Sequence, residues 1–409
     1  MSPALKFSLH QFFHWFCVGI FFPIMTLFFM DRGLTLVEVG FCVSVYSAMI
    51  LLFELPTGGL ADQVGRKLVY LISAGISICA CAVAIGFPNH KEVVFLVMGL
   101  LGISRSLSSG TIDAWFVDRF KEVTPEGDLQ KAFARVGIAI PLGLALGTLI
   151  GGGLPMLSSK FGMNRYDLNL WVMLGAFIWV SIYTLIWIDE PGDQFDRRLV
   201  NSFQNLPRVL NDAFQFGFKH KAIFLLMTAT LFWGLAIVAV ESFWQPQVKS
   251  ILGSEEQSWI FGLLASGYFA ASALGNTVIT PICRLFRNHY SSVLVLVRVT
   301  MGVSFFLMAA QTVIWGFAVF YLFLFFQNGL LNSPHQSLFH ELVPSEKRST
   351  LISLESLFMS IGGIFSSIAC GWISEAYSIA FAWQLAGTIF AGSAAFYFLF
   401  GRIQRGSKS

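Results

Sequence analysis

Twelve apolar stretches, each long enough to cross a lipid bilayer, follow one another along the chain. A membrane-crossing helix needs about 20 mostly apolar residues, and short segments with turn-forming residues separate most of these stretches. We therefore predict an all-α membrane protein with twelve transmembrane helices. The expected spans are residues 8–30, 38–58, 68–88, 92–115, 132–157, 168–188, 221–246, 257–283, 291–312, 314–337, 349–374 and 379–401.

One long polar interval separates the sixth span from the seventh. Residues 189–220 are rich in charged side chains, whereas most other intervals are short. We predict an N-terminal six-helix bundle at residues 1–190, a cytoplasmic linker at 191–220 and a C-terminal six-helix bundle at 221–409. Apolar residues recur in the linker with helical spacing, which predicts an amphipathic helix there.

Composition excludes several classes of protein. Of the 409 residues, 56% are hydrophobic and 12% are charged, whereas soluble domains average about 25% charged residues. A soluble fold could not hide so much apolar surface, and disordered chains are poor in aromatic residues. The net charge of +3 is too small to indicate a nucleic-acid partner. The six cysteines form no CxxC pair and no cluster with histidine, so we expect no metal site and no cofactor.

The positions of Lys and Arg predict the orientation in the membrane. If the N-terminus is inside the cell, 19 of the 26 Lys and Arg residues lie in inside segments and 5 lie in outside segments. Because cytoplasmic loops carry an excess of Lys and Arg, both termini are expected to be cytoplasmic. The predicted location is the plasma membrane, with the lipid bilayer as surroundings.

A charged glycine-containing string lies in the loop between the second and third spans. It reads Gly59-Leu-Ala-Asp62-Gln-Val-Gly65-Arg66-Lys67. The two glycines let the chain reverse tightly, and the charges can bind or release neighbouring helix ends at the membrane face. Here the chain resembles the major facilitator superfamily, whose signature in this loop reads G-x-L-A-D-x-x-G-R-K.

Two further segments add to the resemblance. Glu54-Leu-Pro-Thr-Gly58 precedes the loop, and Asp113-Ala-Trp115 with Asp118 ends the fourth span. Both look like one bacterial branch of the family, and the topology is similar along the whole chain. The resemblance implies a rocker-switch transporter with a central cavity between two six-helix halves.

The resemblance also implies a conformational latch. In the family, the loop aspartate and arginine form a charge relay with an acid at the end of the fourth span. Asp62, Arg66 and Asp118 would accordingly lock the outward-facing state and release it as the protein turns inward. The counterpart in the second half, residues 281–287, lacks the aspartate, so no symmetrical latch is implied there.

A stripe of glycines in the fifth span has two interpretations. Gly143, Gly147 and Gly151 form a small-xxx-small ridge that permits close packing of helices. The same segment resembles the glycine-proline signature of the antiporter branch, although the usual Gly-Pro pair is Ile140-Pro141 here. The second interpretation favours export.

Ionisable residues inside the membrane are expensive and are therefore functional candidates. Arg105 and Asp113 fall on a polar stripe of the fourth span, and Glu54 lies at similar depth on the second. A partly desolvated acid can bind and release protons near neutral pH, so these three residues are candidates for proton coupling. The alternative is that Glu54 or Asp113 is permanently paired with Arg105 or Arg135. Arg298 and Glu355 are expected to form a structural pair.

The tenth span carries a group of polar side chains. These side chains either bind substrate in the cavity or form hydrogen bonds between helices. Two aromatic residues are further candidates for lining the cavity. Two histidines at the start of the first span are expected at the membrane interface. The cavity candidates are Gln327, Asn328, Asn332, His335, Trp233 and Tyr268, and the interfacial histidines are His10 and His14.

Together these features predict a secondary active transporter that works by alternating access. The favoured activity is proton-coupled export of a lipophilic or amphiphilic small molecule, such as a drug, a secondary metabolite or a siderophore, by a monomer. The alternative is a proton-coupled importer or facilitator of a nutrient. A polytopic membrane enzyme is a remote alternative, because no Ser/His/Asp set, HExxH or phosphate loop is present.

Overall fold

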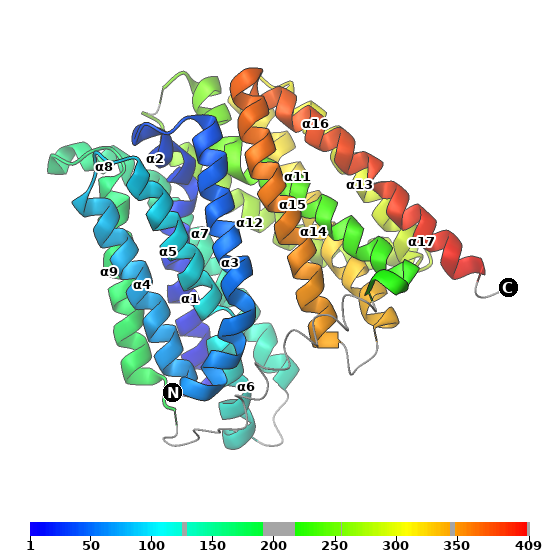
Figure 1. Ribbon diagram of the computed structural model, residues 1–409, viewed down its shortest axis with the longest axis horizontal. Coiled ribbons are helices and arrows are strands. Elements are labelled where there is room, and N and C mark those ends of the chain that lie inside the picture. The colour runs from blue at the N-terminus through cyan, green and yellow to red at the C-terminus, as the bar shows by residue number, and fades with distance from the viewer. Residues whose placement is uncertain (125–128, 191–216, 255, 344–347, 407–409) are drawn as a thin grey trace. The chain divides into compact units, whose positions relative to one another are not determined.

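The computed structural model describes residues 1–124, 129–190, 217–254, 256–343 and 348–406, and these residues are helical nearly throughout (Figure 1). Within these ranges, twelve helical segments are long and apolar enough to cross a membrane, and no strand occurs. The predicted all-α architecture with twelve transmembrane helices is therefore confirmed. Most of the predicted linker helix lies outside the described residues.

The chain divides into two compact units. The N-terminal unit contains the first six spans except for a short piece of the second, and the C-terminal unit contains the last six except for a short piece of the eighth. The N-terminal unit comprises Met1–Leu34, Val45–Gln204 and Glu255–Gly267, and the C-terminal unit comprises Thr35–Ser44, Asn205–Ser254 and Tyr268–Ser409.

Two spans of the N-terminal unit are interrupted. In the first span Pro23 lacks an amide hydrogen for the helix, and a single 3-10 turn joins two α-helices there. The fourth span breaks after Ser108. The elements are α1 (Pro3–Phe21), η1 (Phe22–Ile24), α2 (Met25–Asp31), α3 (Leu36–Val64), α4 (Arg66–Gly86), α5 (Glu92–Ser108), α6 (Thr111–Val123), α7 (Leu129–Gly153), α8 (Pro155–Ser158), η2 (Ser159–Phe161) and α9 (Asp167–Trp187).

The glycine ridge of α7 lies directly against the backbone of α1. A Cβ atom added at Gly147 would lie 2.5 Å from the carbonyl oxygen of Phe16. Cβ atoms at Gly143 and Gly151 would overlap backbone carbonyl oxygens of α1 in the same way. The ridge therefore permits close packing of the two helices, as its spacing predicts.

The C-terminal unit repeats this arrangement with different residues. α11 packs closely on α15, because a Cβ atom at Gly362 would overlap the carbonyl oxygen of Leu231 and one at Gly234 would overlap that of Met359. The twelfth span is divided at Ser393. The elements are α11 (Lys221–Leu252), α12 (Trp259–Leu285), α13 (Tyr290–Ala309), α14 (Ile314–Leu342), α15 (Arg348–Ala376), α16 (Ile379–Gly392) and α17 (Ala394–Gly406).

Candidate functional site

A polar pocket of about 180 Å³ lies within the N-terminal unit, next to the break in the fourth span. Gly110, between α5 and α6, has a φ of 70°, a conformation that glycine adopts without strain. Such a break frees backbone polar groups in a membrane helix, and it is tolerated where the backbone lines a polar cavity. The lining residues are His10, Gln11, His14, Trp15, Tyr70, Arg105, Ser108, Ser109, Gly110, Ile112, Asp113 and Ile140.

Asp113 supplies the acidic side of this pocket. It lies in the first turn of α6, and its carboxylate accepts a hydrogen bond of 3.3 Å from the side-chain amide of Gln11 on α1. The sequence singled out Asp113 but gave no reason to expect Gln11 as its partner.

Arg105 supplies the basic side. Its guanidinium carbon lies 5.2 Å from the centroid of the Trp15 ring, a cation–π contact. Among the described residues, no carboxylate lies within ion-pair distance of Arg105. The alternative of a permanent pair between Arg105 and Asp113 is therefore not what the structure shows.

His10 and His14 line the pocket. They are 1% and 8% exposed. His14 Nδ1 is 3.0 Å from the Tyr70 hydroxyl, whereas neither ring nitrogen of His10 has a hydrogen-bond partner among the described residues. Their position at the membrane interface stays a prediction, but their place in the pocket was not expected. Their four-residue spacing, with Gln11 between them, puts three polar side chains on one helical face, and this pattern could have indicated the pocket.

Glu54, the third candidate for proton coupling, lies elsewhere. It is exposed near the end of the predicted second span, in α3, and it is not among the residues that line the pocket. Its role in proton coupling stays a prediction.

The structure brings together two members of the predicted latch. Arg66 Nη1 and Asp118 Oδ2 are 2.5 Å apart, between the start of α4 and the middle of α6. Gly65, with a φ of 105°, precedes α4. Lys67 Nζ donates to the carbonyl oxygen of Leu185 at 2.8 Å. Gly59 and Asp62 belong to α3, but the side-chain contacts at these two positions lie outside what the structure describes.

The sequence did not indicate that Glu190 belongs to this cluster. Its carboxylate accepts hydrogen bonds from the backbone amides of Arg66 at 2.6 Å and Lys67 at 3.1 Å, so it caps the N-terminus of α4. A Cβ at position 65 would lie 3.0 Å from the same carboxylate. This cap comes from 124 residues further along the chain, and no local pattern could have predicted it.

Asp189, next to Glu190, ties the end of α9 to other helices. Its carboxylate forms a 2.5 Å ion pair with Lys6 of α1, and its carbonyl oxygen accepts from Trp115 of α6 at 2.8 Å. The hydrogen bond from Lys6 holds the pKa of Asp189 below its ordinary value. Residues 189 and 190 therefore join α1, α4 and α6 at one end of the N-terminal unit.

The C-terminal unit contains a buried chain of polar side chains around His335. His335 Nδ1 lies 2.6 Å from the Tyr397 hydroxyl, and Nε2 contacts a carboxylate oxygen of Glu355. Thr230 donates to the same oxygen at 3.0 Å. Arg298 donates to Tyr397 at 3.5 Å. Among the described residues, Arg298 and Glu355 make no direct ion pair; His335 and Tyr397 link them.

The other predicted cavity residues make hydrogen bonds between helices. Gln327 accepts from Ser304 at 2.7 Å, and Asn328 accepts from the indole of Trp233 at 2.7 Å. These contacts agree with the interhelical alternative. Of the other two candidates, Tyr268 donates a hydrogen bond to Glu241 at 2.7 Å, and Asn332 is exposed. Substrate binding by any of these residues stays a prediction.

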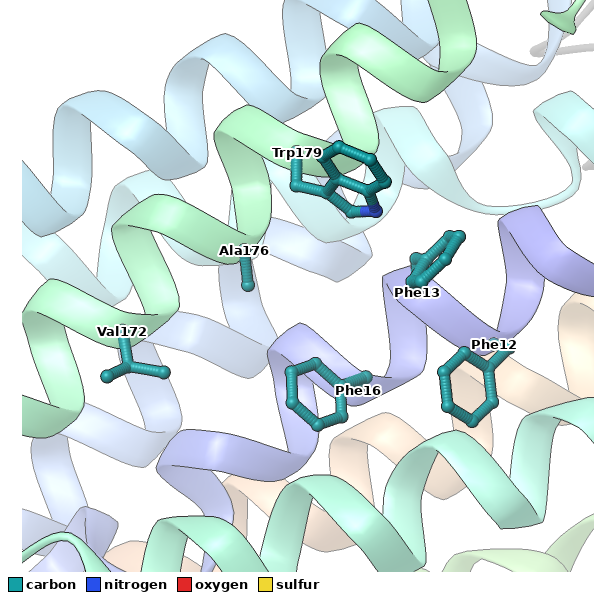
Figure 2. Close-up of a pocket in the computed structure, with 6 residues that line it drawn as sticks. All are labelled: Phe12, Phe13, Phe16, Val172, Ala176 and Trp179. Atoms are coloured by element: carbon teal, nitrogen blue, oxygen red, sulfur yellow. The ribbon is translucent and has the colours of Figure 1, made fainter.

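An apolar groove of about 340 Å³ lies on another face of α1. Figure 2 shows three phenylalanine rings of α1 opposite Trp179, Ala176 and Val172 of α9. One helix therefore presents an aromatic face to the groove and a polar face to the pocket. The phenylalanines are Phe12, Phe13 and Phe16.

Comparisons with known proteins agree with this architecture. The chain matches the family model described as Major Facilitator Superfamily over residues 7–259 and 242–408. The uncharacterized MFS-type transporter YxaM of Bacillus subtilis (strain 168) is 26% identical over 370 residues, which cover 88% of this chain and 87% of YxaM.

Two other similarities are more limited. The quinolone resistance protein NorA of Staphylococcus aureus (strain MRSA252) is 24% identical over 143 residues, 35% of this chain and 36% of NorA. The crystal structure of the nucleoside transporter NupG is similar with a TM-score of 0.77 at 17% identity, over 98% of both chains. At that identity the likeness to NupG shows the fold alone.

Proposed function

Because the chain belongs to the Major Facilitator Superfamily, we propose that it works by alternating access and exports a lipophilic or amphiphilic small molecule in exchange for protons. It is a multi-pass protein of the bacterial inner membrane, and it is a transporter rather than an enzyme. Coupling to protons, the direction of transport and the cytoplasmic location of both termini are parts of the proposal.

The surroundings of Asp113 are the observation that supports coupling to protons. An acid in a membrane helix is costly and usually has a functional role. This one lies in a polar pocket, where its hydrogen bond from the side chain of Gln11 is long at 3.3 Å. A carboxylate in that setting can exchange a proton without breaking an ion pair. Arg105, on the other side of the pocket, would favour release of the proton through its charge.

Export is supported by two features. One is the similarity of about a third of the chain to a quinolone resistance protein. The other is the resemblance of the fifth span to the antiporter signature, with Pro141 inside α7. The ion pair between Arg66 and Asp118 supports the proposed latch, which would hold one state of the transport cycle.

Proton flux in inside-out membrane vesicles tests the proposal. After respiration has acidified the lumen, addition of a quinolone or of ethidium should alkalinise it, which acridine orange fluorescence reports. Asp113→Asn should lower this response at least about tenfold, because the exchangeable carboxyl is lost. Lumenal pH that stays constant while either compound is transported would show that the transporter is not a proton antiporter.

A matched control and a direction test complete the experiment. Glu92, an exposed acid in the first turn of α5, should tolerate substitution by Gln with an unchanged response. Intact cells that express the protein should hold less of the compound than cells that do not. Greater accumulation would instead favour the importer.

A further inference from the structure

The polar pocket holds one cationic and one anionic side chain that do not contact each other. Asp113 is hydrogen-bonded to Gln11, and Arg105 stacks on Trp15. Among the described residues, the guanidinium N–H groups of Arg105 donate no hydrogen bond. Within that part of the chain, the five strong donors of this guanidinium therefore have no acceptor.

His10 adds a second donor without a partner on the same pocket. Its side chain is 1% exposed, its ring centroid lies 4.3 Å from that of Tyr70, and both of its nitrogens lack a hydrogen-bond partner in the part of the chain that the structure describes. Buried polar atoms are nearly always hydrogen-bonded. A neutral imidazole has one N–H donor and one acceptor nitrogen. His10 and Arg105 line the same pocket, which therefore indicates a place where another molecule supplies an acceptor to both side chains.

The size of the pocket limits what can enter. Pockets that enclose a whole drug-sized ligand have volumes of about 300–1,000 Å³, whereas this one has about 180 Å³. It can hold the charged head of a molecule, and the remainder would extend out of it. This matches the amphiphilic substrate of the proposed function.

Charge complementarity determines the kind of head group. A purely anionic head would be repelled by Asp113, and a purely cationic head would be repelled by Arg105. A head that carries both charges meets an opposite charge on each side. Carboxylate is the group that the planar guanidinium binds best, through two parallel hydrogen bonds.

We propose that this pocket binds the head group of an amphoteric substrate, with its carboxylate on Arg105 and His10 and its ammonium group on Asp113. The inference rests on the proposed function for the role of the bound molecule as substrate. The proposal also explains how substrate is exchanged for a proton. When the ammonium group leaves Asp113, a proton can take its place on the carboxylate, so that substrate and proton bind alternately to one side chain.

Three probes that share one ring test the proposal on the purified full-length protein. They are benzoate, benzylamine and 4-(aminomethyl)benzoate, which carry the acid, the amine and both. Quenching of tryptophan fluorescence measures binding, since Trp15 stacks on Arg105. The amphoteric probe should bind at least about tenfold tighter than either other probe, because each added charge-assisted hydrogen bond is worth about that factor.

Single substitutions should separately remove the preference for a carboxylate and the preference for an ammonium group. Arg105→Gln should make 4-(aminomethyl)benzoate bind no tighter than benzylamine, and Asp113→Asn should make it bind no tighter than benzoate. His10→Asn should weaken only the two probes that carry a carboxylate, which provides a second test if the Arg105 variant does not fold. Glu92→Gln should bind all three probes as the wild type does.

Two results would overturn the proposal. One is equal affinity of the wild type for the amphoteric probe and for benzylamine. The other is a preference for carboxylates that survives in a folded Arg105→Gln or His10→Asn variant, as judged by gel filtration. Because binding is measured without a proton gradient, its failure leaves proton-coupled export untouched, and absence of proton flux leaves this binding site untouched.

Discussion

In the C-terminal unit, His335 is held between Tyr397 and Glu355. In the N-terminal unit, His10 lies against the ring of Tyr70, and neither of its ring nitrogens has a hydrogen-bond partner among the described residues. Each unit also buries or half-buries one arginine and one acid near its histidine. In one unit hydrogen bonds connect these groups into a chain. In the other an open space separates them.

The connected chain has a consistent assignment of hydrogens. Arg298 donates to the Tyr397 oxygen, so the Tyr397 hydroxyl can donate to His335 Nδ1, and His335 Nε2 can then donate to Glu355. With a neutral imidazole each hydrogen bond along this chain has one donor and one acceptor, and the charges of Arg298 and Glu355 balance. Arg298 Nε has no hydrogen-bond partner among the described residues. We infer that this network holds α11, α13, α14, α15 and α17 together, while the pocket of the N-terminal unit is free to bind.

The largest expected effect comes from breaking the network. Glu355→Leu leaves Arg298 buried without a compensating charge, so the protein should lose about 3–5 kcal/mol of stability, the usual result of removing one partner of a buried pair. Thermal unfolding in detergent measures this loss. The double variant Arg298→Met with Glu355→Leu should regain most of it.

The matched change in the N-terminal unit is Asp113→Leu. Among the described residues Asp113 forms no ion pair, and its hydrogen bond comes from Gln11, so this variant should lose only about 1–2 kcal/mol. Equal losses in Glu355→Leu and Asp113→Leu would show that the two units do not differ in the way we describe.

The next effect concerns the close helix pairs, which the two units share. Gly147→Ala and Gly362→Ala each place a methyl group against a backbone carbonyl of the facing helix, so each should cost about 1–3 kcal/mol through overpacking. Gly75, on α4, has open space around it, and its replacement by Ala should not destabilise the protein. If only one of the two units is sensitive, the internal repeat does not extend to these contacts.

A smaller effect is expected at the latch, where the units differ in sequence. Asp118→Asn removes the partner of Arg66 on the exposed end of α6, so stability should change by less than about 1 kcal/mol. Transport, which depends on the balance between two states, should fall several-fold. Arg284, exposed in the counterpart segment of the C-terminal unit, should tolerate Gln with unchanged transport. A drop in transport for Arg284→Gln would indicate a latch in both units.

The smallest effect belongs to Asp189, which lies at the surface of the N-terminal unit. Its folded-state pKa is lowered by Lys6 from an ordinary value of 3.8, so the stabilisation is present above that value and is lost as the pH falls through the folded pKa. Asp189→Asn should therefore lower the unfolding temperature slightly at pH 7 and not at all near pH 2. A difference that grows on acidification would contradict this assignment.

Sequence patterns predicted the features that depend on many residues at once. The twelve apolar spans and the packing role of the ridge at Gly143, Gly147 and Gly151 follow from composition or a repeated spacing, and the family follows from the resemblance of the loop string at residues 59–67 to the family signature. Breaks within spans were missed at Pro23 and Gly110, because an apolar window does not register a single residue that interrupts the helix.

The candidate site was predicted only in part, for a related reason. Asp113 and Arg105 stood out because charges are rare in apolar stretches, and both line the pocket. His10 was missed because a histidine near the end of a span is common at interfaces. Glu190 was missed because its hydrogen bonds reach across the fold to α4.

The contact of α1 with α7 has a mechanical consequence. Between most helices, side chains can change rotamers when one helix shifts against the other. Along this ridge the glycines of α7 contact the backbone of α1 directly, so side chains do not separate the two backbones there. We therefore expect the two helices to move together. A tilt of α7 should then also displace His10, Gln11 and His14 on α1. The shape of the pocket that they line should accordingly change with the position of α7.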